Sequence, residues 1–169
     1  MALARAATIG ITCGFVMAGM VLGAAAKLGP RYIGAPDAAI SSSVVIPPDC
    51  SIAFLSGAAG LRPGEQVPRD PGDTEAQTAL ALDNIESGLK ELGLALGDVV
   101  MMRSYLVTDA TRGKADFEGY SRAYKRRFGI AEQPNKPARV TVEVAKLVVP
   151  GLLVEIEVTA AQCHGKDKR

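Results

Sequence analysis

The sequence has very few of the side chains that hold metal ions or drive nucleophilic catalysis. Its 169 residues include one histidine and three cysteines. The spacing of Cys13, Cys50, Cys163 and His164 matches no usual zinc-binding pattern. The histidine also stands close to the C-terminus. These scarcities argue against a metal site and against a Ser-His-Asp or Cys-His catalytic site.

An excess of charge of one sign is absent as well. Nineteen lysines and arginines face 18 aspartates and glutamates, so the formal net charge is +1. This balance argues against a protein whose main role is electrostatic capture of nucleic acid or anionic lipid. The run Lys125-Arg126-Arg127 is typical of a solvated helix face, and we expect no nucleic-acid partner.

The N-terminus has the pattern of an export signal. Residues 6–26 carry no charge, and the run ends in Gly23-Ala24-Ala25-Ala26. A short basic start, an apolar middle and a small-residue exit predict a secretory signal peptide over residues 1–26. Because the run is long enough to cross a bilayer, an uncleaved N-terminal membrane anchor is the alternative, and membrane contact is expected only in that case. Either way, we expect the rest of the chain to work outside the cytoplasm, most simply in the periplasm.

Removal of such a leader would leave two cysteines. Cys50 and Cys163 are then candidates for a disulfide, because exported proteins fold in oxidising compartments. The sequence does not indicate whether their Cα atoms come within bridging distance. The pairing therefore stays open at this point.

The remainder of the chain reads as one α/β domain. Residues 27–43 are expected to be a linker, residues 44–162 the domain, and residues 163–169 a polar tail. The patterns predict strands over 44–46, 51–56, 98–107, 139–146 and 152–159, and helices from Asp73 or Thr74 to Gly93 and from Asp116 to Gly129. Each predicted helix carries a stripe of residues at helical spacing, namely Leu82, Ile85, Leu89 and Leu92 in the first and Phe117, Tyr120, Tyr124 and Phe128 in the second. This order predicts a mixed sheet of about six strands with two helices covering one face.

The last two predicted strands alternate apolar and polar residues. Val140, Val142 and Val144 are interleaved with polar residues, and we expect the valines to pack against the helices. The opposite face would then carry Arg139, Thr141, Glu143, Glu155 and Glu157. Such a face is either solvated or packed against another subunit with a pocket between the two.

Several segments resemble the RidA (YjgF) family. They are Leu55-Ser56-Gly57, Leu82-Asp83-Asn84-Ile85, Gly97-Asp98-Val99-Val100, Pro137-Ala138-Arg139-Val140-Thr141-Val142-Glu143-Val144 and Val154-Glu155-Ile156-Glu157. The resemblance implies a chorismate-mutase-like fold and a homotrimer with a central barrel and clefts between subunits. It further implies hydrolysis of 2-imino or enamine carboxylates to 2-oxo acids and ammonia, without a metal or organic cofactor.

The resemblance also assigns roles to particular residues. Arg139 would clamp the substrate carboxylate through a two-pronged pair. Glu155 would hold or deprotonate the water that attacks the imine carbon and return the proton to the departing amine. Ser56 and the backbone of Gly57 are candidates for hydrogen bonds to the substrate. The alternative for Arg139 is a structural ion pair with Glu143 or Glu157.

Three positions depart from the usual family pattern. Ser43 stands where the family has a tyrosine, Ser121 where an asparagine is common, and Thr141 where a cysteine is frequent. We expect these residues to line the substrate pocket and to alter its preference. Two other functions therefore stay open: a deaminase or hydrolase for a larger catabolic carboxylate, and a non-catalytic trimer that binds small carboxylates.

Overall fold

The structure is a computed structural model that describes residues 29–68 and 70–164. The predicted leader over residues 1–26 lies outside the described residues, as do residues 165–169 of the predicted tail. The described residues form two α-helices, a 3₁₀ turn and six strands, in the order β1 (Arg31–Ile33), β2 (Ser43–Val45), β3 (Cys50–Ala59), α1 (Thr74–Glu91), η1 (Leu96–Asp98), β4 (Val99–Leu106), α2 (Phe117–Lys125), β5 (Ala138–Glu143) and β6 (Val154–Cys163). Among the described residues, no helix combines the length and apolar character needed to cross a bilayer.

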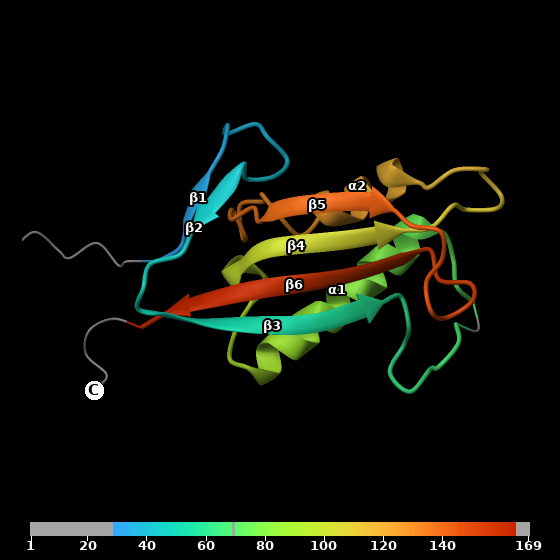
Figure 1. The fold of residues 1–169 in the computed structure, drawn as a ribbon, viewed down its shortest axis with the longest axis horizontal. Coiled ribbons are helices and arrows are strands. Elements are labelled where there is room, and N and C mark those ends of the chain that lie inside the picture. The colour runs from blue at the N-terminus through green and yellow to red at the C-terminus, as the bar shows by residue number, and fades with distance from the viewer. Residues whose placement is uncertain (1–28, 69, 165–169) are drawn as a thin grey trace, which may run out of the picture.

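The four longer strands form one mixed sheet in the order β3-β6-β4-β5. Strand β5 runs parallel to β4, and the other pairs are antiparallel. Both helices lie on the same face of this sheet (Figure 1). Strands β1 and β2 form a separate hairpin. The predicted α+β fold with two helices on one face is confirmed, with the six strands divided between two sheets.

Local signals explain where the helices begin. The Asp73 side chain caps α1 by accepting a hydrogen bond from the Ala76 N–H at 2.9 Å, and Asp116 caps α2 through the Gly119 N–H at the same distance. Each carboxylate satisfies a backbone donor that the first helical turn leaves unpaired. Both predicted starts are therefore confirmed. Helix α2 ends at Lys125, one turn earlier than the predicted Gly129.

The core lies between α1 and the sheet. Leu82, Ile85 and Leu89 of α1 are buried, and they pack in one cluster with Val154 and Ile156 of β6. Burying each of these side chains contributes roughly 1.5–3 kcal/mol relative to leaving it exposed. The apolar stripe read from the sequence is thus the face that attaches α1 to the sheet.

The two faces of β5 are the reverse of the prediction. Val140 and Val142 are 47% and 40% exposed. Arg139 pairs in register with Met102, whose side chain is fully buried on the helix side of the sheet. Arg139, Thr141 and Glu143 therefore share the helix-covered face, and the valines do not. Alternation defines the two faces of a strand without indicating which one the helices cover.

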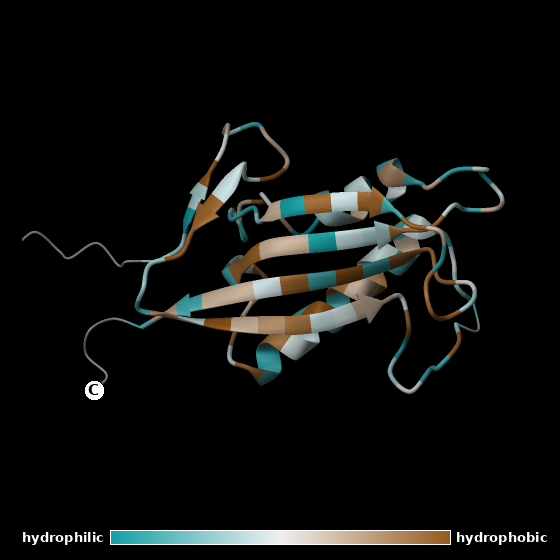
Figure 2. Cartoon of the chain, viewed as in Figure 1, coloured by the Kyte–Doolittle hydropathy of each residue, from teal (hydrophilic) through white to brown (hydrophobic). Residues whose placement is uncertain are grey.

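The uncovered face of the sheet, called here the open face, is partly apolar. It exposes Phe54 to 81% and Ile52 to 49%, in addition to the two valines of β5. Figure 2 shows apolar positions, in brown, along both β3 and β5. Glu155 and Glu157 of β6 lie on the same face, because their register partners on β4, Tyr105 and Arg103, alternate with the buried residues of that strand. Exposed aromatic and aliphatic side chains in this number are typical of a surface that packs against another protein.

The segment expected to be a linker belongs in part to the folded domain. Within residues 27–43, Tyr32 donates hydrogen bonds to the carbonyls of Gly97 and Val99 at 3.0 and 3.2 Å. Burial raises the pKa of Tyr32 to about 12, so its hydroxyl stays protonated. Ser41 forms an isolated parallel β-bridge with Ala138 at the start of β5. Strand β1, which contains Tyr32, was not predicted because three residues, two of them exposed, are too few to show a strand pattern in the sequence.

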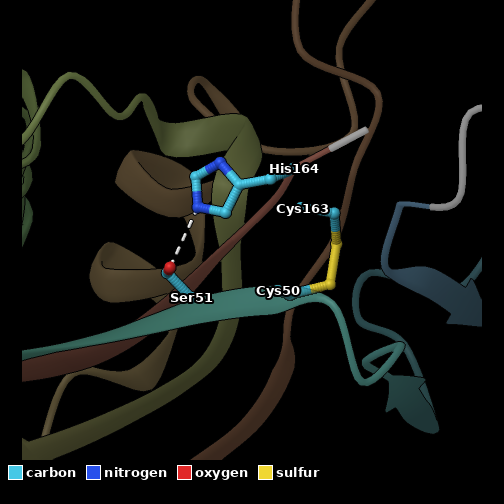
Figure 3. Close-up of a disulfide and its surroundings, with 4 residues drawn as sticks. All are labelled: Cys50, Ser51, Cys163 and His164. Carbon is cyan, nitrogen blue, oxygen red and sulfur yellow. Dashed lines mark hydrogen bonds between the residues drawn. A yellow bond between two sulfur atoms is a disulfide. The ribbon is translucent and has the colours of Figure 1, made fainter. Parts of the chain in front are cut away.

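A disulfide closes the far end of the sheet. Cys50 is the first residue of β3 and Cys163 the last of β6, and the two stand directly opposite each other in the antiparallel pair. Figure 3 shows this bond together with the neighbouring contact between Ser51 Oγ and His164 Nε2, 2.9 Å apart. The pairing left open by the sequence is thus formed in the structure.

Candidate functional site

Arg139 lies between the sheet and α2, against two aromatic rings. Its Cζ is 4.2 Å from the ring centroid of Tyr124 and 5.1 Å from that of Tyr120. Its Nη1 is buried without a hydrogen-bond partner within the described part of the chain. The guanidinium is therefore oriented by π faces and retains unused hydrogen-bond donors.

The structural ion pairs considered for Arg139 are not formed. Glu143 accepts a hydrogen bond from Thr108. Glu157 accepts from Tyr105 at 2.9 Å and pairs with Arg103 at 3.3 Å on the open face. None of the ion pairs among residues 29–68 and 70–164 involves Arg139. Its positive charge is therefore not neutralised by these carboxylates.

Glu155 lies on the open face beside Gly57. A Cβ added to Gly57 would overlap with Oε1 of Glu155, so the carboxylate occupies the space that a side chain would fill. The register of β3 against β6 shifts between Leu55 and Ala58, and this bulge contains Gly57. Of the predicted β3 residues, the structure thus brings Gly57 to Glu155. Ser56 is exposed in the same bulge.

Arg139 and Glu155 do not meet within one chain. They lie on opposite faces of the sheet, and strand β4 runs between their strands. Arg139 is paired in register with Met102 of β4, and Met102 is paired with Val158 of β6, which is three residues from Glu155 in sequence. Given strand spacing near 4.8 Å and a rise near 3.3 Å per residue, the two backbones are offset by about 10 Å in each direction. A small substrate cannot contact both side chains of a single chain.

The other predicted pocket residues lie in different parts of the fold. Thr141 lies on the same face of β5 as Arg139, and its Oγ1 is buried without a partner in the described part of the chain. Ser121 is half-buried on α2 and lies in sequence between the two tyrosines that contact Arg139. Ser43 is exposed on β2. Arg139, Thr141 and α2 thus form one half of a candidate site, and Gly57 with Glu155 forms the other.

Tyr120 and Tyr124 contact Arg139, a role that their sequence pattern did not reveal. The spacing of these residues indicated an apolar helix stripe, and both are indeed buried. Each also presents a ring to Arg139, and Tyr120 makes a 2.7 Å hydrogen bond with Ser104. Desolvation raises the pKa of both phenols, so both stay neutral at physiological pH. The available signal was the pair of tyrosines four residues apart, which places both rings on one helix face.

The basic run at the C-terminal end of α2 has a structural role. Arg126 binds Glu75 of α1 at 2.6 Å, and Arg127 binds Glu86 at 2.9 Å and also Asp83. Hydrogen bonds from Arg126 and from the neighbouring Arg122 lower the pKa of Glu75. Two of the three cations of the run are therefore engaged in joining the helices. Among the described residues, no three His, Cys, Asp or Glu side chains gather in a way that could hold a metal ion.

Substitution of Gly57 by alanine is expected to displace the Glu155 carboxylate. The added Cβ would meet a carboxylate at the end of a flexible side chain, which can swing away at little cost in stability. If Glu155 acts in catalysis, activity should fall by roughly 10- to 100-fold while the melting temperature changes by no more than about 2 °C. Steady-state kinetics and thermal unfolding would measure the two effects.

Gly29 provides the matched control. A Cβ added there meets nothing within 4 Å, so Gly29→Ala should leave both activity and melting temperature unchanged. Equal activity in the Gly57→Ala protein and the wild type would show that the position of Glu155 beside Gly57 is unimportant.

Known proteins are similar to this chain in sequence. The family model described as Endoribonuclease L-PSP matches residues 34–162. A RutC family protein of Pyrococcus abyssi is 36% identical over 102 residues, which cover 56% of this chain and 72% of that protein. TdcF of Escherichia coli, described as a candidate reactive intermediate deaminase, is 31% identical over 112 residues, covering 66% of this chain and 80% of TdcF.

Solved structures agree with the sequence comparisons. The Rid-family protein YyfB of Yersinia pestis superposes with a TM-score of 0.64 at 25% identity, covering 79% of this chain and 99% of YyfB. The crystal structure of E. coli TdcF with bound serine superposes with a TM-score of 0.54 at 25% identity, covering 78% of this chain and 98% of TdcF. Since the family model spans most of the chain and the fold agrees with that of Rid-family structures, this chain belongs to the Endoribonuclease L-PSP family, which is the RidA (YjgF) family.

Proposed function

We propose that the protein is an imine deaminase that hydrolyses 2-imino or enamine carboxylates to 2-oxo acids and ammonia. The observation that carries this proposal is Arg139, a cation held by aromatic rings with no carboxylate of the described chain paired to it. Such a guanidinium can bind an incoming carboxylate through paired hydrogen bonds. The similarity to TdcF supports the same reaction class.

The chemistry needs positioning and one proton carrier. A substrate carboxylate bound to Arg139 presents the adjacent C=N carbon in a fixed orientation. Glu155 accepts a proton from a water molecule, whose oxygen adds to that carbon. That proton passes from Glu155 to the nitrogen, which gives a carbinolamine. The carbinolamine hydroxyl then gives up its proton, which Glu155 carries to the amino nitrogen, so that the C–N bond breaks, ammonia leaves and the carbon becomes the carbonyl of the 2-oxo acid. One water is consumed for each ammonia released.

We further propose that the working form is a homotrimer whose sites lie between subunits. Arg139 and Glu155 can contact one substrate if they come from two different chains, because they lie on opposite faces of the sheet in each chain. The open face carries exposed apolar side chains, including Phe54 and Val140, that a second copy would cover. This arrangement fits the trimer with intersubunit clefts that the family resemblance implies.

The substrate is proposed to be a small carboxylate. TdcF binds serine in its crystal structure, which is a small carboxylate next to a nitrogen-bearing carbon. Ser43, Ser121 and Thr141 replace the larger or different groups of the usual family pocket. We therefore expect tolerance of longer or branched side chains in addition to the smallest imines.

We also propose that the protein acts outside the cytoplasm. The uncharged run over residues 6–26 has the form of an export signal. The Cys50–Cys163 disulfide is a bond that persists in oxidising compartments and is rare in the cytosol. The two observations are independent of each other and support the same compartment.

The reaction can be tested with imines generated in place. An amino-acid oxidase would supply 2-iminoalkanoates, and semicarbazide trapping would report the imine that survives. We expect the wild-type protein to accelerate imine loss, and Arg139→Ala or Glu155→Gln to lower that acceleration by at least about 100-fold. Lys90→Ala, which removes a cation from the outer side of α1, should act as wild type.

The opposite outcome has a clear meaning. No acceleration with small, branched and aromatic imines would contradict the deaminase assignment. Thermal stabilisation by 2-oxo acids that depends on Arg139 would then favour a non-catalytic carboxylate-binding trimer.

A further inference from the structure

Three aromatic rings form a ladder along one face of α2 and its C-terminal extension. Tyr120 and Tyr124 have centroids 6.4 Å apart with planes inclined by 21°, and Tyr124 and Phe128 have centroids 4.8 Å apart with planes inclined by 12°. All three side chains are at most 3% exposed. The first two rings face Arg139, which projects from the neighbouring strand β5.

The ladder is itself held in place. The Tyr120 hydroxyl forms a 2.7 Å hydrogen bond with Ser104 Oγ and lies 3.4 Å from the sulfur of Met102, both on β4. The Tyr124 ring is packed between the other two rings. Buried rings with this packing have little freedom to rotate, so the guanidinium rests against a rigid surface.

A π surface has a chemical advantage over a carboxylate as the support for this arginine. A protein carboxylate would orient the guanidinium, but it would also occupy its donors and cancel the charge that a substrate carboxylate needs. An aromatic face attracts the cation and leaves the in-plane N–H groups unoccupied. Thr141 Oγ1 and Arg139 Nη1 are both buried and have no hydrogen-bond partner in the described part of the chain. Both groups are therefore available to hydrogen-bond a substrate.

We infer that Tyr120 and Tyr124 are positioning residues that hold Arg139 by cation–π contact so that its charge and donors remain available to the substrate carboxylate. This inference rests on the proposed function, because it assumes that Arg139 binds the carboxylate. Tyr124, with the shorter separation of 4.2 Å, carries the larger share of the effect, and Tyr120 at 5.1 Å the smaller.

A series of fluorinated rings tests the inference without changing ring shape. Tyr124 would be replaced in the full-length protein by phenylalanine and then by mono-, di- and trifluorophenylalanine, which progressively withdraw electron density from the π face. The Kd for pyruvate, a 2-oxo carboxylate, would be measured by calorimetry. We expect phenylalanine to bind within about twofold of wild type and the trifluoro ring to bind roughly 5- to 30-fold more weakly, with log Kd rising steadily along the series.

Two controls separate this role from packing. The same series at Phe128 alters a ring that stacks on Tyr124 but that makes no cation–π contact with Arg139 in the described structure, so its Kd values should stay constant. The series at Tyr124 in an Arg139→Met background should have no effect on any residual binding. Melting temperatures should stay level throughout, because every ring in a series has nearly the same shape.

Failure of the inference and failure of the proposed function give different results. A flat series at Tyr124, in a protein whose pyruvate binding is lost in Arg139→Met, would overturn the cation–π role and leave the carboxylate clamp standing. Pyruvate binding that is unchanged in Arg139→Met would overturn the clamp itself.

Discussion

Mixed trimers built from two inactive variants are expected to recover about one third of the wild-type rate of imine hydrolysis. One variant is Arg139→Ala and the other Glu155→Gln. If each site takes Arg139 from one chain and Glu155 from the next around a closed ring, a trimer containing both variants has one interface at which both residues are native. The other two interfaces lack at least one of them. This result would follow from the placement of the two side chains on opposite faces of the sheet.

The experiment requires trimers that contain both variants. The two chains would be co-expressed with different affinity tags and purified through both tags in succession. The recovered fraction does not depend on the ratio of the chains, because every mixed trimer has one intact interface. Mixed trimers of wild type with a tagged wild type would provide the reference rate.

Other recovered fractions would change the conclusion. Recovery of about one half would indicate a dimer with two sites. No recovery, with both single variants inactive, would place Arg139 and Glu155 of one chain in the same site and contradict the intersubunit arrangement. Full activity in either single variant would remove that residue from the mechanism.

Loss of the Cys50–Cys163 disulfide is expected to lower the melting temperature by roughly 10 °C. The bond joins residues that are 113 apart in sequence and therefore closes most of the described chain into a loop. Cross-linking a loop of this length restricts the unfolded chain, with a typical stabilisation of about 2–4 kcal/mol. Thermal unfolding of the Cys50→Ser/Cys163→Ser protein, compared with wild type at one protein concentration, measures the shift.

Reductant serves as the control for this prediction. Dithiothreitol should lower the melting temperature of the wild type toward that of the double-serine variant and leave the variant itself unchanged. A wild type whose melting temperature does not respond to reductant or to the double substitution would contradict a stabilising role for the disulfide.

Local features of the sequence were sufficient to predict both helices and strands β2 to β6. Asp73 and Asp116 predicted both helix starts, because an aspartate before an apolar stripe satisfies the first free N–H groups of a helix. Strands β4, β5 and β6 were predicted from alternation and β-branched residues. The segment around Arg139 and Glu155 carried the family resemblance, which the comparisons confirmed.

The candidate site was only partly accessible from the sequence. Arg139, Thr141 and Glu155 could be selected, but Tyr120 and Tyr124 were identified only as members of a helix stripe. A tyrosine on a helix stripe is most often a packing residue, and nothing in its spacing shows what lies across the interface. Tyr124 contacts Arg139 because the fold brings α2 next to β5, although Arg139 is 15 residues further along the chain.

The sequence by itself determined both helices, strands β2 to β6 and the family, because these follow from short-range patterns and from motifs. Only the tertiary structure decided which face of β5 meets the helices, that Cys50 meets Cys163, and that Arg139 and Glu155 lie on opposite faces of one sheet. Alternation has a period of two and looks the same whichever face is covered. Strand order and helix packing, which join residues far apart in sequence, remove that ambiguity.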